Sequence, residues 1–203
     1  MNTATRQFPL LVFLFFVFLA ITAFTLGGCG HVPVSSMYKL SKVDIETTDV
    51  EKLQVAVQIP NAVKVRDEGV TMTMSLRRTD KLPKLYERFK LEQTSSNTTN
   101  TVLAKHRKAD QKILVYRIAR TDIKRLNRFR KIQAGAGDEG KRKGQMTVTT
   151  AVCRKVDLKR GEIKLSTFLR TSETKEFVPL VLDVNLGEAY PKDEFTKQFP
   201  MCD

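Results

Sequence analysis

Few residues of this 203-residue chain could carry out chemistry: three cysteines, two histidines and one glycine-rich stretch. His106 lies within the basic stretch AKHRK, where its cationic neighbours disfavour both protonation and metal binding. His31 is far from it in sequence, and the cysteines form no Cys-x-x-Cys pair. Because zinc sites need several such ligands together, we expect neither a metal site nor a cofactor.

The glycine-rich stretch GAGDEGKR, residues 135–142, satisfies two phosphate-binding patterns, Gly-x-Gly-x-x-Gly and Gly-x-x-x-x-Gly-Lys. The first pattern has to follow a strand and open a helix, because the helix N-terminus holds the pyrophosphate. Here the glycines follow a predicted helix and precede a predicted strand. The second pattern requires Ser or Thr after its lysine, and Arg142 stands there. The stretch therefore predicts a flexible loop and no nucleotide ligand.

Cys29 ends a long apolar run. Residues 8–26 carry no charge, and Arg6 precedes them, as in a secretory signal or a membrane-spanning helix. The run closes on Leu26-Gly27-Gly28-Cys29, which resembles the lipobox of bacterial lipoprotein precursors. The resemblance implies that residues 1–28 are a signal peptide cleaved after Gly28, and that the Cys29 thiol carries a diacylglyceryl group. The alternative is an uncleaved anchor with an incidental cysteine.

The same resemblance predicts where the protein resides. Gly30, rather than Asp, follows the lipidated cysteine, which favours the outer membrane by similarity to sorted lipoproteins. We therefore expect a lipid-anchored protein on the periplasmic face of the bacterial outer membrane, in contact with the membrane through its lipid. Residues 29–36 would form the tether, and residues 37–203 a single β-rich periplasmic domain.

Export has a consequence for the two remaining cysteines. Cys153 and Cys202 would lie in an oxidising compartment, where an even number of cysteines predicts a disulfide. The alternative is two separate thiols, one of them buried in a strand.

The apolar pattern predicts a mainly β domain. Residues 52–60 and 69–78 alternate between apolar and polar, as half-buried strands do. Turn residues within 61–69 predict that these two strands pair as neighbours. Pro179 predicts that the last strand lies at an edge or follows a bulge. Further strands are expected at 85–93, 112–119, 144–153, 162–170 and 177–186, and one more starting near Tyr38 and Leu40.

One amphipathic helix is expected from Thr121 to Gln133, with Thr121 or Asp122 as its N-cap. About seven or eight short strands with one helix favour an antiparallel β-sandwich-like domain, because too few helices exist to connect parallel strands. The helix should dock its apolar side chains on the sheet, namely Ile123, Leu126 and Phe129. Its basic side chains fall on the opposite side, beside a basic loop: Lys124, Arg125, Arg128 and Lys131, then Lys141, Arg142 and Lys143. Ile132 falls on that basic side and is expected to be exposed.

Charge is concentrated in residues 105–143, which hold 14 Lys/Arg and 4 Asp/Glu. The segment has three interpretations: a solvated helix face, a surface for anionic envelope components such as lipid or lipopolysaccharide, or a surface for an acidic protein partner. Nucleic acid is excluded by the compartment. No spacing of serines or carboxylates argues for catalysis. We expect a non-catalytic binding or scaffold domain, with a carrier of anionic lipid as the alternative and an envelope hydrolase as a weaker one.

Overall fold

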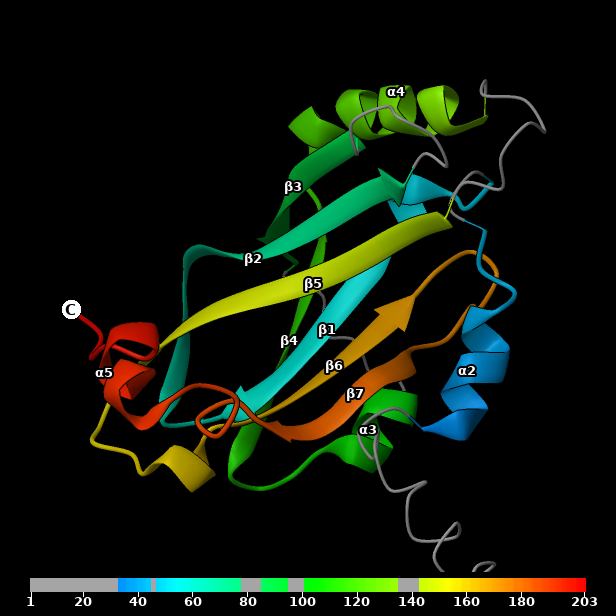
Figure 1. Ribbon diagram of the computed structural model, residues 1–203. Coiled ribbons are helices and arrows are strands. Elements are labelled where there is room, and N and C mark those ends of the chain that lie inside the picture. The colour runs from blue at the N-terminus through cyan, green and yellow to red at the C-terminus, as the bar shows by residue number, and fades with distance from the viewer. Residues whose placement is uncertain (1–32, 45–46, 78–84, 95–100, 135–142) are drawn as a thin grey trace, which may run out of the picture. The chain divides into compact units, whose positions relative to one another are not determined.

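The computed structural model describes residues 33–44, 47–77, 85–94, 101–134 and 143–203 (Figure 1). Within them, seven strands form one antiparallel sheet in the order β5-β2-β3-β4-β1-β6-β7, which confirms the predicted mainly β, antiparallel class. The strands are β1 (Gln54–Pro60), β2 (Val63–Arg77), β3 (Leu85–Gln93), β4 (Gln111–Ile118), β5 (Lys143–Arg154), β6 (Lys164–Arg170) and β7 (Val178–Asn185).

Helices lie around the sheet (Figure 1). They are α2 (Val34–Leu40), α3 (Thr101–His106), α4 (Ile123–Ala134) and α5 (Phe195–Gln198). The predicted helix corresponds to α4, which a 3-10 turn at Arg120–Asp122 precedes. The prediction of a strand near Tyr38 and Leu40 is wrong, because helix α2 occupies these residues. The helix begins at Val34 and buries Ser36, so the end of the predicted tether belongs to the domain.

Strand β1 lies within the sheet between β4 and β6 and is buried on both faces. On one face Val55, Val57 and Ile59 join the main hydrophobic core. On the other face Ala56 packs in a smaller cluster beneath α3, together with Leu103, Val115, Phe168 and Phe177. The buried Gln58 side chain donates a hydrogen bond to the carbonyl of His106, 2.7 Å away, so its amide is satisfied.

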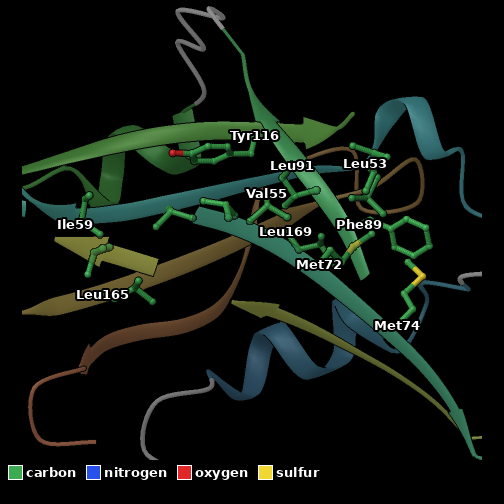
Figure 2. Close-up of a cluster of buried hydrophobic side chains, with 14 of the residues drawn as sticks. Leu53, Val55, Ile59, Met72, Met74, Phe89, Leu91, Tyr116, Leu165 and Leu169 are labelled. Carbon is green, nitrogen blue, oxygen red and sulfur yellow. The ribbon is translucent and has the colours of Figure 1, made fainter. Parts of the chain in front are cut away.

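Strand β3 connects the two halves of the sheet. Its first part, Leu85–Lys90, pairs with β2, whereas its last part, Leu91–Gln93, pairs with β4. The sheet therefore curls, and side chains of β2 and β3 meet those of β1, β4 and β6 across the core (Figure 2). Met72, Phe89 and Leu91 are among these buried side chains.

The expected pairing of β1 with β2 is wrong. Asn61 and Ala62 separate the two strands, but β1 pairs with β4 and β6, and β2 pairs with β3 and β5. The short link instead carries the chain from one half of the curled sheet to the other. Pro179 agrees with its prediction, since β7 is an edge strand whose register with β6 shifts beside this residue.

The C-terminal tail is attached to the end of β5. The structure places the sulfur atoms of Cys153 and Cys202 2.04 Å apart, as the sequence predicted for a disulfide. Backbone hydrogen bonds flank this pair: Arg154 N–H donates to the Pro200 carbonyl, and Cys202 N–H donates to the Arg154 carbonyl. The tail thus adds a short parallel bridge, Arg154 to Met201, beside β5.

Arg154 is buried and holds the same tail through its side chain. Its Nε donates to the Phe199 carbonyl at 2.7 Å, and a terminal nitrogen donates to the Asp157 carboxylate at 2.8 Å. The guanidinium also lies 5.2 Å from the ring centre of Phe195. Because these contacts satisfy a buried cation, they order the tail independently of the disulfide.

We predict that the double change Cys153→Ser and Cys202→Ser lowers the free energy of unfolding by about 4 kcal/mol, the chain-entropy value for such a loop. Urea denaturation of a fragment of residues 33–203 measures this loss. Wild-type fragment in reductant serves as the control and should match the double variant. Two thiols that alkylate freely in the native, oxidised protein would contradict the bridge.

Candidate functional site

A bulge in β2 opens the sheet. The strand pairs with β5 through Val65, and the pairing resumes only at Val70, so Arg66–Gly69 bulges between them. A Cβ atom at Gly69 would lie 2.6 Å from the carbonyl oxygens of Ala151 and Arg66, which makes glycine the residue that fits. The neighbouring Glu68 has a φ of 55°, an uncommon conformation for a non-glycine residue.

The bulge directs Glu68 toward β3. Both carboxylate oxygens of Glu68 lie 2.7 Å from Nζ of Lys90. The backbone of Lys90 is held at the same point, because its N–H donates to the Asp122 carboxylate at 3.1 Å and its carbonyl accepts from Ala119 N–H. Asp122, predicted as a helix N-cap candidate, thus ties the start of α4 to β3.

Between β2, β3 and β4 lies a groove of about 710 Å3, which we call the β2–β4 groove. This volume falls within the usual range for small-molecule sites. Its apolar lining includes the buried Leu91 and Tyr116 and the partly buried Leu114. Charged side chains surround this lining: Lys64, Arg66, Asp67, Glu68, Lys90, Glu92 and Lys112. The arrangement suits a ligand with an apolar body and a charged group.

Lys112 stands out among these charges. Burial lowers the pKa of its ammonium group below the ordinary lysine value, and the positive charge of Lys155 lowers this pKa further. Among the ion pairs of the described residues, none involves Lys112. A half-buried cation without a carboxylate partner favours an anion brought by a ligand.

A second hollow, of about 540 Å3, adjoins the groove between β3 and the start of α4. It shares Glu68, Lys90 and Thr121 with the groove and adds the cations Arg88 and Arg125. The groove and the basic side of α4 therefore lie next to each other.

The orientation predicted for α4 is correct. Leu126 and Phe129 are buried in the core, and Ile123 packs against it. On the opposite side, Ile132 is 47% exposed. The predicted cations of this side are also exposed: Lys124, Arg125, Arg128 and Lys131. We call these four side chains the basic helix surface.

Arg125 differs from the other three cations. Its guanidinium contacts the carboxylates of Asp122 and Glu87 at 3.0 and 3.1 Å and lies 4.8 Å from the ring centre of Phe89. It also donates to the Arg88 carbonyl at 2.6 Å. Arg125 thus helps to attach α4 to β3 and offers less charge to a ligand than Lys124, Arg128 or Lys131.

The basic segment 105–143 does not form one continuous surface. Strand β4 separates its first part from α4, and eight residues of strand span about 26 Å. Lys108, in the first part, pairs with Asp183 of β7 at 2.5 Å. Cys29 and the loop residues Lys141 and Arg142 lie outside the described residues, as does the side chain of Lys143.

Sequence reasoning missed the groove and Lys112. The signal was present in β4, where Lys112, Leu114 and Tyr116 alternate with Ile113 and Val115. Period-two alternation places Lys112 on the face that carries Leu114 and Tyr116, both of which contact the main core. A lysine at a position that the alternation assigns to the core face is the signal that could have identified Lys112 from the sequence.

Other functional signals are sparse in the described part of the chain. No cluster of three or more His, Cys, Asp or Glu residues there could hold a metal ion. None of the helices described has the length and apolar character to cross a membrane. Comparisons with protein-family models, curated proteins and solved structures find no match.

We predict that Gly69→Ala lowers the free energy of unfolding by about 1–3 kcal/mol, because the added methyl group would overlap two backbone oxygens. Gly161→Ala is the matched control, since its Cβ would meet nothing closer than 3.9 Å. Chemical denaturation compares the two variants. Equal stability of both would show that the bulge is not constrained as described.

Proposed function

We propose that this protein is a lipid-anchored, non-catalytic binding protein of the bacterial envelope, and that its β2–β4 groove binds an amphiphile with an anionic group. The proposal rests on the half-buried Lys112, which forms no ion pair among the described residues and lies beside the apolar lining of the groove. The apolar body of the ligand would lie over Leu114 and the small exposed parts of Leu91 and Tyr116. Its anionic group would lie near Lys112 and offset the cost of burying that ammonium group.

Two features support a binding function over catalysis. The carboxylate of Glu68 is already engaged by Lys90. Among its described lining residues, the groove contains Thr121 but no serine, cysteine or histidine, the common nucleophiles and bases.

The proposal of a lipid anchor is supported by the N-terminal sequence. The uncharged run of residues 8–26 followed by Leu26-Gly27-Gly28-Cys29 resembles a lipoprotein signal, and Gly30 favours the outer membrane. Two or three acyl chains at Cys29 would hold the domain firmly at the periplasmic face of that membrane.

A protein partner is the second candidate, favoured by the open edge of β2. Within the described residues, Val63–Val65 pair with β5 on one side, and β3 pairs with β2 only from Thr71 onward. An extended segment of another envelope protein would find free backbone groups along this wall of the groove.

Our central functional prediction is that Lys112→Met weakens the binding of a long-chain alkyl sulfonate to a fragment of residues 33–203 by about tenfold to a hundredfold, through loss of a charge-assisted contact. Because burial disfavours the charged form of Lys112, its replacement by Met should leave the melting temperature the same or raise it. Wild-type affinity should fall as the pH rises through the lowered pKa of Lys112. Calorimetry measures affinity, and a thermal melt measures stability.

The controls separate the groove from the basic helix surface. The charge reversal Lys124→Glu, Arg128→Glu and Lys131→Glu leaves Arg125 in place and should keep sulfonate affinity. An alcohol of equal chain length should bind more weakly than the sulfonate. If the charge reversal abolishes binding while Lys112→Met keeps it, the ligand binds at α4. If neither ligand binds, the groove proposal fails.

For the anchor, we predict that Cys29→Ser leaves an unprocessed precursor that takes up no labelled palmitate, because the serine hydroxyl cannot form the thioether. Intact mass and radiolabel of the wild type and the variant measure this. Identical masses with no label in either protein would show an uncleaved anchor instead.

A further inference from the structure

Helix α2 presents its apolar side chains to solvent. Val34, Met37 and Tyr38 are 81%, 61% and 68% exposed. At 100° per residue these three side chains fall on one side of the helix. The opposite side carries the buried Ser36 and the partly buried Leu40, which packs against the core. The helix therefore turns an apolar face away from the domain.

The orientation of this face is fixed by contacts on the other sides of the helix. α2 packs against β7, and Nζ of Lys39 pairs with the Glu176 carboxylate just before that strand. Ser41 N–H donates to the Met37 carbonyl and ends the helix. A rotation of α2 that buried the three apolar side chains would expose Leu40 and break the Lys39 ion pair.

We propose that the Val34, Met37 and Tyr38 face of α2 lies in the interface of the lipid bilayer that holds the anchor. The inference rests on the proposed lipidation of Cys29. Five residue steps separate Cys29 from Val34. An extended chain covers at most about 3.6 Å per residue, so Val34, at the start of the face, lies within roughly 18 Å of the lipidated residue. A tether this short keeps the apolar face at the membrane surface.

The composition of α2 fits that location. Tyrosine is favoured at the membrane interface, where its ring contacts acyl chains and its hydroxyl stays hydrated. Nζ of Lys42 lies 4.4 Å from the ring centre of Tyr38 and can extend toward lipid phosphates. The helix would lie in the plane of the interface with its apolar face inserted.

This contact would also orient the groove. Lys64, at one end of the groove, stands opposite Cys153 in the β2–β5 pairing, near the C-terminal tail. Figure 1 shows α2 and α5 at opposite ends of the sheet. With α2 on the bilayer, the Lys64 end of the groove would therefore lie on the side away from the anchoring membrane.

Tryptophan fluorescence tests the contact, because the chain contains no tryptophan. The full-length lipidated Tyr38→Trp variant is reconstituted in vesicles of phosphatidylethanolamine and phosphatidylglycerol, with or without bromine-labelled acyl chains. We expect its emission to shift to shorter wavelength and to lose most of its intensity to the bromolipid. Tyr86→Trp, at a site on β3 that is 52% exposed, is the control and should be unaffected.

Second substitutions locate the contact on the helix. Met37→Asp added to Tyr38→Trp should restore the emission of a solvated indole, whereas Ser35→Asp, on the flank of α2, should not.

Flotation and intact mass of the same samples report the anchor separately. An unlipidated protein that fails to float refutes the anchor. A lipidated protein whose Tyr38→Trp emission stays unquenched refutes the α2 contact and leaves the anchor intact. If the indole of Tyr38→Trp is shielded from water in native envelopes but not in vesicles, a protein covers the face. That result also refutes the contact of α2 with the bilayer.

Discussion

Strand β3 holds the two halves of the sheet together through its divided pairing. One strand pairs with β2 over its first six residues and with β4 over its last three, so the sheet has to curl around it. The curl brings the apolar faces of the two halves together and creates the core. Beyond the short β3–β4 ladder, β2 and β4 diverge, and the same geometry that closes the core leaves the β2–β4 groove open at its side.

The charges of the groove follow from this arrangement. The Arg66–Gly69 bulge lets β2 bend away while Glu68 stays paired with Lys90, so one cation of the groove is neutralised within the protein. Lys112 has no such partner among the described ion pairs and stays close to Lys155, at a cost to stability. A cation whose charged form is disfavoured by burial and that lines a ligand-sized hollow is typical of binding sites.

Local patterns in the sequence predicted the elements, and pairings distant in the chain set their arrangement. Alternation identified the strands, and the 3.6-residue period placed Leu126 and Phe129 in the core correctly. The turn residues around Asn61 wrongly predicted that β1 and β2 pair as a hairpin. Strand β1 pairs instead with β4 and β6, and no local pattern in the sequence reveals these two partners. Helix α2 was not predicted because its apolar side chains face solvent, whereas the apolar side chains of a helix usually face the core. The charge of residues 105–143 was read as one surface, but β4 separates its ends.

The pKa of Lys112 reports whether the groove binds an anion at this lysine. NMR titration of the side-chain methylene next to Nζ, in a fragment of residues 33–203, measures this pKa with and without a saturating long-chain alkyl sulfonate. We expect a pKa below the ordinary lysine value in the free protein. The pKa should rise when the ligand binds, because a nearby anion stabilises the ammonium form. A Lys112 pKa that the bound sulfonate leaves unchanged would show that the anion does not bind at this lysine.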